Sequence, residues 1–332
     1  MNYKISLMPS EISFDADQEL TILQSALKND VVLEHSCGNG QCGACKTKLI
    51  NGRISFEDKF NILTENDKSE KIFLSCVTKP LSDISIRADF YPELLDVKTK
   101  TVPCKVHSIE YPVESVAVLK LRLPPSADFN FLPGQYIDLT YNGVSRSYSI
   151  ASAIVENNLL ELHIRKVTDG VFSGFVFNEF KPNQLLRMQG PIGTFFIRKT
   201  DKPLIFVAGG TGFAPVKAMV ESLIKQDDKR AIHIYWGARK QDDIYSDLPN
   251  QWANQYPNII SQVIVSDDNT WDGRCGFVHQ AVLDDFENLN GFMVYACGAS
   301  AMINIARRTF IEKGLDEHSF IADAFLPATA IA

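Results

Sequence analysis

The sequence lacks several features that would place it in a familiar class of protein. No apolar run approaches the length of a membrane span, and no apolar segment near the start predicts a signal peptide. Internal repeats and low-complexity segments are also missing. Basic residues are not in excess, since 33 Lys and Arg against 40 Asp and Glu leave a net charge of −7. We therefore expect a cytoplasmic protein whose main partner is neither nucleic acid nor a membrane.

The composition is otherwise ordinary. The chain has 332 residues, of which 45% are hydrophobic and 22% are charged. That balance is typical of a globular protein, and the length allows two or three domains. Seven cysteines in a chain with no sign of export indicate a reducing compartment, where cysteines serve metal or thiol chemistry.

Three of those cysteines share one short loop, SCGNGQCGACK, and a fourth follows after thirty intervening residues. The spacing C-x4-C-x2-C with a distant fourth cysteine is typical of the ligands of a plant-type [2Fe–2S] cluster. The glycines let the backbone turn tightly and approach inorganic sulfide. Core cysteines, disulfides and zinc are the alternatives, but core cysteines rarely share a loop, and zinc usually takes two C-x2–4-C pairs. The predicted ligands are Cys37, Cys42, Cys45 and Cys76.

The segment around this loop, residues 1–90, is predicted to form short strands and one helix. With its cysteine pattern it resembles a plant-type ferredoxin, which implies a small α+β domain of the β-grasp type. Residues 91–102 contain one proline, mixed charge and little periodicity. We interpret them as a linker, or alternatively as a loop within one domain.

From residue 103 the pattern changes to about six alternating strands with Gly, Pro and Asn turns, which predicts an antiparallel β-barrel over 103–199. One strand carries Arg146-Ser147-Tyr148-Ser149 and resembles the R-x-Y-[ST] strand of the ferredoxin–NADP-reductase superfamily. The resemblance implies an FAD site in which Arg146 pairs with the pyrophosphate, Tyr148 stacks on the isoalloxazine and Ser149 faces atom N5. An ordinary exposed strand with the same four letters is the alternative.

A second flavin contact is predicted where the next strand meets a helix. A glycine at a helix start presents N–H groups and the positive end of the helix dipole to a phosphate. The resemblance places the following residues there: Gly170, Val171, Phe172 and the Ser173 hydroxyl. An ordinary turn is the alternative. Ile164 and Arg165 would contact the cofactor through their backbone, whereas His163 is equally well explained as a core histidine.

From residue 200 the rhythm becomes strand–helix–strand, which predicts a parallel α/β sheet over 200–332. The apolar run PLIFVA leads into GGTGFAP and a helix, an arrangement that cradles phosphate. The turn resembles the superfamily's nicotinamide-binding GG-T-G-x-[AS]-P sequence, and in that family a cysteine after a later strand lies beside the carbon that gives up hydride. A buried structural thiol is the alternative for that cysteine. The predicted contacts are Gly210, Thr211, Gly212, Cys297 and Gly298, and Ser149 and Cys297 are the predicted catalytic pair.

Charge after the third strand of this sheet bears on the choice of nicotinamide cofactor. NADP-using relatives have a Ser-Arg pair there, whereas this chain has Ser266, Asp267 and Asp268. Carboxylates repel a 2′-phosphate and accept from a ribose hydroxyl, which favours NADH. Basic side chains after the second strand can offset them, and the aspartates can equally form a solvated turn. In the tail that we expect after a final strand, Phe325 would cover the flavin or pack the C-terminus.

Together the modules imply a multi-domain enzyme in which electrons pass from NADH through FAD and the [2Fe–2S] cluster to an acceptor protein. Long stretches, among them GGTGFAPVKAMVE, IYWGAR and GFVHQAVLDD, resemble the CDP-6-deoxy-Δ3,4-glucoseen reductases. That family's acceptor is a pyridoxamine-phosphate (PMP)-dependent CDP-4-keto-6-deoxyglucose 3-dehydratase of 3,6-dideoxysugar biosynthesis. Those sugars occur in bacterial surface polysaccharides such as the lipopolysaccharide O-antigen.

Two alternatives remain. The reductase of an aromatic-ring-hydroxylating oxygenase shares the module order, although we expect its tail to read closer to E-K-F than to DAF. A non-enzymatic electron-relay subunit would not oxidise NADH itself, and the intact flavin strand, glycine turn and Cys297 argue against it.

Overall fold

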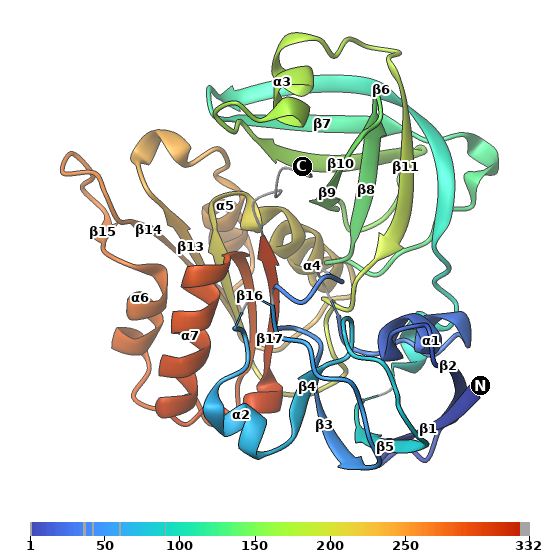
Figure 1. Cartoon of the computed structure of the whole chain (residues 1–332). Coiled ribbons are helices and arrows are strands. Elements are labelled where there is room, and N and C mark those ends of the chain that lie inside the picture. The colour runs from blue at the N-terminus through green and yellow to red at the C-terminus, as the bar shows by residue number, and fades with distance from the viewer. Residues whose placement is uncertain (1, 36–37, 42, 60, 90, 326–332) are drawn as a thin grey trace. The chain divides into compact units, whose positions relative to one another are not determined.

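The computed structural model describes residues 2–35, 38–41, 43–59, 61–89 and 91–325, and the chain divides after residue 98 into two compact units. The first unit holds one β-sheet and the second holds two (Figure 1). No helix in these ranges is long and apolar enough to cross a membrane. The segment boundaries at 90, 102 and 199 stay predictions.

The first unit is a small α+β fold. Its elements are β1 (Asn2–Met8), β2 (Ser13–Asp17), α1 (Ile22–Lys28), β3 (Lys46–Asn51), α2 (Glu65–Ser69), β4 (Ile72–Leu74), β5 (Ile84–Arg87) and the 3₁₀ helix η1 (Pro92–Leu94). The sheet order is β2-β1-β5-β3-β4, with the central pair β1 and β5 parallel. Helix α1 begins after Thr21, which forms a reciprocal capping box with Gln24. The helix buries Ile22, Leu23 and Ala26 in the apolar core of the sheet.

The second unit begins with a curled antiparallel sheet. Its elements are β6 (Lys100–Val113), β7 (Val116–Arg122), η2 (Pro125–Ala127), β8 (Tyr136–Tyr141), β9 (Val144–Ser149), β10 (Leu159–Arg165), α3 (Val171–Asn178) and β11 (Leu185–Ile192). The order is β10-β7-β6-β11-β8-β9, and the residues just after β9 meet β10 through the bridge Ile150↔Leu162 and a hydrogen bond from Ala151 N–H to Glu161 O. Helix α3 lies over one end of the sheet and buries Phe172 and Val176 in its core (Figure 1). The predicted antiparallel barrel is confirmed in this curled form.

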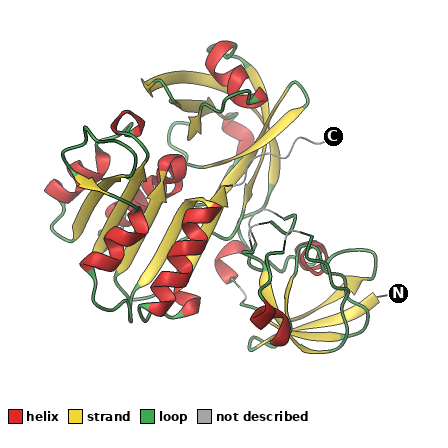
Figure 2. Ribbon diagram, turned by 60° about the vertical axis from the view of Figure 1, so that its left-hand side comes forward, coloured by secondary structure: helices red, strands yellow, loops and turns green. Residues whose placement is uncertain are grey.

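The remaining elements form an α/β layer structure. They are β12 (Leu204–Gly209), η3 (Gly210–Gly212), α4 (Phe213–Lys225), β13 (Ile232–Ala238), η4 (Gln241–Asp243), α5 (Leu248–Gln255), β14 (Ile259–Val265), β15 (Arg274–Cys275), α6 (Val278–Asp285), β16 (Met293–Ala299), α7 (Ser300–Glu312), η5 (Glu317–Ser319) and β17 (Phe320–Phe325). All six strands are parallel. Helices α4 and α5 pack into one apolar cluster and α6 and α7 into another, so that helices cover both faces (Figure 2). This explains why β12 is buried from Leu204 to Ala208.

The strand order positions the site. The parallel sheet reads β15-β14-β13-β12-β16-β17, so the direction of winding reverses between β12 and β16. Ligands of such sheets bind outside the carboxyl ends of the strands at this reversal. The glycine turn follows β12, and Cys297 lies near the end of β16. Val116 of β7 and Phe195, which follows β11, belong to the same apolar cluster as α4, so the two parts of the second unit share a core.

Candidate functional site

Strand pairing brings two of the predicted cluster ligands together. Cys45 immediately precedes β3, Cys76 follows β4, and these strands pair through Lys46 and Leu74. The sulfur atoms of Cys45 and Cys76 lie 3.1 Å apart, which is well beyond the length of a disulfide bond. Both side chains are buried. Cys37 and Cys42 lie outside the described residues.

The loop that leads to Cys45 has little room for side chains at two of its glycines. Gly40 and Gly43 have φ values of +86° and +75°, where L side chains are strained. A Cβ on Gly40 would lie 3.1 Å from the Val77 side chain, and one on Gly43 would lie 3.1 Å from the Ile62 side chain. A backbone held this close to its surroundings, next to two buried thiols, fits an iron–sulfur cluster.

The predicted flavin residues on strand β9 differ in burial and in their hydrogen-bond partners. Arg146 is half-buried, and among the described residues no carboxylate pairs with it. The Tyr148 ring lies 5.5 Å from that of Phe172, and burial raises the pKa of its hydroxyl. The exposed Ser147 donates to Asp138 at 2.5 Å. Ser149 Oγ is buried, and the described part of the chain offers it no hydrogen-bond partner.

An unsatisfied buried hydroxyl is unfavourable by about 1–3 kcal/mol, and a hydrogen bond from a bound ligand to Ser149 Oγ would remove that penalty. A cation without a carboxylate partner at Arg146 likewise suits an anionic ligand. These two observations fit a flavin nucleotide at β9, and its orientation stays a prediction.

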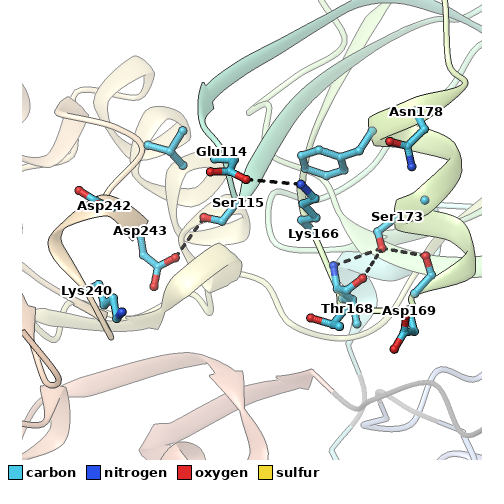
Figure 3. Close-up of a pocket in the computed structure, with 15 residues that line it drawn as sticks. Glu114, Ser115, Lys166, Thr168, Asp169, Ser173, Asn178, Lys240, Asp242 and Asp243 are labelled. Carbon is cyan, nitrogen blue, oxygen red and sulfur yellow. Dashed lines mark hydrogen bonds and ion pairs between the residues drawn. The ribbon is translucent and has the colours of Figure 1, made fainter.

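The start of α3 exposes backbone rather than hydroxyl groups. Ser173 Oγ donates to Gly170 O at 3.0 Å and accepts from Val167 N–H at 3.2 Å, so its hydroxyl closes the turn (Figure 3). Phe172 is buried in the barrel core, whereas Val171 is exposed. A cavity of about 890 Å³ opens here between α3, the β6–β7 turn and η4. It is lined by Gly170 and Ser173 but not by Tyr148 or Ser149.

The two other predicted backbone contacts lie beside this turn on β10. Ile164 is buried in the barrel core. Arg165 pairs with Asp243 at 3.2 Å, and Ser115 donates to the same carboxylate oxygen at 3.0 Å. The two contacts therefore tie the curled sheet to η4.

The glycine turn after β12 touches the end of β16. A Cβ on Gly212 would lie 2.2 Å from the backbone carbonyl oxygen of Cys297, so only glycine fits there. Gly210, with φ +53°, accepts a hydrogen bond from the Trp236 indole at 2.9 Å. Cys297 is fully buried, and burial raises the pKa of its thiol well above the ordinary value. The structure thus brings together the glycine turn and the predicted hydride-site cysteine.

The acidic segment after β14 is tied to the end of β13. Asp267 N–H donates to Arg239 O at 2.8 Å, and the two side chains pair at 3.2 Å with both of them exposed. Asp268 accepts from Gln241 N–H at 3.1 Å, and Ser266 N–H donates to Ala238 O at 3.0 Å. Arg239 is therefore already partnered by a carboxylate.

The prediction that the tail begins at residue 323, after the last strand, is wrong for residues 323–325. Residues 323–325 belong to β17 itself, where Ala299 pairs with Phe325, because the strand continues alongside β16. Phe325 is partly buried and packs against the cluster that contains α4. Residues 326–332 lie outside the described residues.

Sequence reasoning missed one polar group of residues between the two parts of the second unit: Glu161, Lys217 and Tyr245, which contact His163 or one another. The available signal was Lys217, a charge next to the apolar residue Val216 in the segment GGTGFAPVKAMVE. Sequence alone does not say which partners it meets.

Three family models match the chain in order. A 2Fe-2S iron-sulfur cluster binding domain matches residues 5–81, an oxidoreductase FAD-binding domain matches 103–197 and an oxidoreductase NAD-binding domain matches 206–308. These matches confirm the predicted multi-domain fold class and the predicted set of cofactors, namely a [2Fe–2S] cluster, FAD and NADH.

Curated relatives align along almost the whole chain. CDP-6-deoxy-L-threo-D-glycero-4-hexulose-3-dehydrase reductase of Yersinia pseudotuberculosis is 52% identical over 330 residues, which covers 99% of this chain and 100% of that protein. Protein RfbI of Salmonella typhimurium is 47% identical, with coverage of 100% and 99%. Terephthalate 1,2-dioxygenase reductase component 2 of Comamonas is 33% identical, with coverage of 98% of each chain. The predicted NAD(P)H-dependent oxidoreductase activity is thereby confirmed.

Solved structures show the same fold. The reductase GcoB of Amycolatopsis superposes with a TM-score of 0.79 at 24% identity, covering 98% of this chain and 100% of that one. A ferredoxin reductase in carbazole 1,9a-dioxygenase superposes with a TM-score of 0.70 at 24% identity, with coverage of 98% and 99%.

Proposed function

Because the chain belongs to the family of CDP-6-deoxy-hexulose-3-dehydrase reductases, within the ferredoxin–NADP-reductase superfamily, we propose that it reduces a sugar dehydrase. Electrons would pass from NADH through FAD and the [2Fe–2S] cluster to a PMP-dependent CDP-4-keto-6-deoxyglucose 3-dehydratase of 3,6-dideoxysugar biosynthesis. The observation that carries this proposal is 52% identity along 99% of the chain, against 33% for the reductase of an aromatic dioxygenase.

When bound, FAD would supply two-electron chemistry toward NADH, and the cluster would supply one-electron chemistry toward the acceptor. The chain's own residues bind and orient these groups. Arg146 would hold the flavin pyrophosphate with its guanidinium, aided by N–H groups at the start of α3. Tyr148 would lie against the flavin ring, and the Ser149 hydroxyl, which lacks a partner among the described residues, would hydrogen-bond to it.

The glycine turn after β12 would hold the nicotinamide cofactor through its backbone. Gly210, Thr211 and Gly212 begin the α4 region, where N–H groups favour a pyrophosphate. The protonated, fully buried Cys297 would exclude water from the reacting carbon rather than act as a nucleophile.

We propose that the acidic segment after β14 makes this chain prefer NADH over NADPH. Ser266 and Asp267 would contact the adenosine ribose, and the Asp267 carboxylate both neutralises Arg239 and repels a 2′-phosphate. Phe325 would contribute an aromatic ring at the flavin. These assignments follow from charge and from position at the carboxyl edge of the sheet.

Electrons would leave the chain at the cysteine loop. Cys37, Cys42, Cys45 and Cys76 would ligate the cluster, and the acceptor protein would dock nearby. That this reductase serves an electron-acceptor protein follows from its family; that the acceptor is the PMP-dependent dehydratase, and that both work in the cytoplasm, are proposals.

The experiment uses the purified chain loaded with FAD and cluster under anaerobic conditions. NADH should bleach the flavin absorbance rapidly, and no bleaching would exclude NADH-dependent reductase activity. The reduced protein is then mixed with the purified dehydratase and its CDP-sugar. A 3-deoxy product that depends on NADH supports the proposal. No product there, with turnover when an aromatic-ring oxygenase is supplied instead, would overturn the choice of acceptor.

A further inference from the structure

A buried polar network joins the flavin-binding sheet to the nicotinamide-binding layer. It consists of Glu161 and His163 on β10, Lys217 on α4 and Tyr245 after η4, and we call it the Lys217 network. The side chains of Glu161, His163 and Lys217 are 17%, 4% and 12% exposed, so the network is largely withdrawn from water. None of these residues has a role in the function proposed above.

Lys217 connects the two predicted cofactor sites directly. It lies in the first part of α4, the helix that begins immediately after the glycine turn. Its Nζ atom contacts Glu161 Oε1 at 3.1 Å, Glu221 Oε1 at 3.0 Å and the Ala151 carbonyl oxygen at 3.1 Å. An ammonium group has three donors, so all of them are used. Ala151 comes two residues after Ser149, so Lys217 holds the end of the flavin strand.

A second connection runs through His163. Its Nε2 atom lies 3.0 Å from Glu161 Oε1, and its Nδ1 atom lies 3.0 Å from the Tyr245 hydroxyl. A carboxylate only accepts, so Nε2 carries the proton and Nδ1 accepts from Tyr245. Burial lowers the pKa of His163, which agrees with a neutral ring that makes both bonds. His163 is therefore not an isolated core residue, because it hydrogen-bonds to Tyr245 in the other part of the unit.

Tyr245 is linked to the glycine turn through two aromatic neighbours. Its ring packs edge-on against Trp236 at 5.1 Å and against Phe213, the first residue of α4, at 6.2 Å. The Trp236 indole donates to the Gly210 carbonyl. The Lys217 network therefore holds the nicotinamide turn through two routes, one along α4 and one through this aromatic group.

Stability alone is a poor explanation for such a network. Removing charged side chains from water carries a desolvation penalty that their attraction often only balances. A hydrogen-bonded network of fixed geometry does, however, restrict how two packed layers sit against each other. Hydride transfer depends steeply on that relation, because a misplacement of about 1 Å lowers a rate roughly 100-fold.

We propose that the Lys217 network fixes the nicotinamide turn against the flavin strand and thereby sets the distance across which hydride is transferred. Lys217, Glu161, His163 and Tyr245 are positioning residues in this proposal, since none of them is placed against a cofactor. The inference rests on the proposed NADH-to-FAD step and is independent of the identity of the final acceptor.

The test compares holoenzyme variants by anaerobic stopped-flow reduction of the flavin with NADH and with NADH deuterated at the transferred position. Lys217→Met keeps the length of the stem and removes the three donors. It should lower the limiting rate of flavin reduction about 10- to 100-fold and change the deuterium isotope effect. Lys217→Arg, which keeps the charge, should recover most of the rate. Lys225→Met, at the end of the same helix, is the matched control and should leave rate and isotope effect unchanged.

FAD content and melting temperature are measured for every variant, because a merely structural role would lower these alone. Wild-type rate and isotope effect in the FAD-loaded Lys217→Met protein would overturn the proposal. If that variant does not fold, Tyr245→Phe decides, since it removes a single hydroxyl. It should slow flavin reduction on the order of threefold to tenfold, the value of one hydrogen bond. An unchanged rate would overturn the proposal.

Failure of the proposed function gives a different result. A wild-type protein that NADH does not reduce would overturn the reductase assignment and the positioning role together. A wild-type protein that is reduced but does not support the dehydratase would overturn only the acceptor, and the variants would still judge the Lys217 network.

Discussion

Adding one methyl group at Gly212 should separate the nicotinamide turn from Cys297 and slow hydride transfer. The φ value of Gly212 is −60°, so alanine is not strained by its own backbone. The obstacle is a neighbour, since the new Cβ would lie 2.2 Å from the Cys297 carbonyl oxygen and 2.7 Å from its carbonyl carbon. Both are backbone atoms with no rotamer to change.

The required movement follows from those distances. An ordinary van der Waals contact begins at 3.4 Å, so the turn and β16 must separate by the difference between 3.4 Å and 2.2 Å, about 1.2 Å. Overpacking of this kind lowers the free energy of unfolding by about 1–3 kcal/mol. A displacement of about 1 Å at a reacting centre lowers the rate roughly 100-fold. We expect Gly212→Ala to retain FAD and the cluster but to reduce its flavin about 100-fold more slowly with NADH.

The assay is the limiting rate of flavin bleaching at saturating NADH, with denaturant unfolding measured in parallel. The control is Gly291→Asn, which lies before the amino end of β16, where φ is +85° and no atom lies within 4 Å of an added Cβ. Asparagine tolerates that conformation, so the control should reduce its flavin at the wild-type rate. A Gly212→Ala protein that matches the wild-type rate would refute the contact between the turn and Cys297 as a determinant of catalysis.

Four further predictions address other parts of the site. Ser149→Ala should leave the melting temperature of the FAD-free protein unchanged or higher, because it removes a buried hydroxyl that has no partner in the described chain. The same variant should reduce its flavin roughly fivefold more slowly, which corresponds to the loss of one hydrogen bond of about 1 kcal/mol. Cys76→Ser should abolish the cluster's visible absorbance while NADH still bleaches the flavin, which absorbance spectra and iron content would check. Asp267→Asn should release Arg239 from its ion pair and raise kcat/KM for NADPH relative to NADH by roughly fivefold. This factor corresponds to about 1 kcal/mol of interaction between two charges 4 Å apart in water. An unchanged ratio would show that this segment does not contact the 2′-position of the ribose. Burial by itself raises the pKa of Glu161, but His163 and Lys217 outweigh burial and lower the pKa from 4.5 to about 2. The stability that the Glu161 carboxylate contributes is therefore present above pH 4.5 and is lost as the pH falls toward 2. Guanidinium unfolding curves should show that Glu161→Gln loses less unfolding free energy over that pH range than wild type does.

Several parts of the site were predictable because they are local in sequence. The cysteine spacing, the R-x-Y-S strand and the glycine turn are each confined to a short stretch, where residue type and backbone conformation together determine the chemistry. The glycines at 40 and 43 illustrate this, since their positive φ values are a property of the loop itself. Domain-family matches then confirmed the cofactors those stretches predicted.

Other parts required the fold. The approach of Cys76 to Cys45 depends on the register of β3 against β4, and a shift of one residue would turn the neighbouring side chains to the other face. The tail around Phe325 was misjudged because strand continuation depends on the partner β16 rather than on local propensity. The engagement of the Ser173 hydroxyl by its own turn was likewise invisible in the sequence.

Short residue patterns predict which chemistry this chain carries: four cysteines for a cluster, a flavin strand and a nicotinamide turn, in that order. The contact of Gly212 with Cys297 and the Lys217 network, in contrast, appear only in the folded chain. The difference lies in how far apart in the sequence the interacting residues are. A motif acts through groups a few residues apart, whereas these contacts join side chains that meet only after the curled sheet and the parallel sheet have packed.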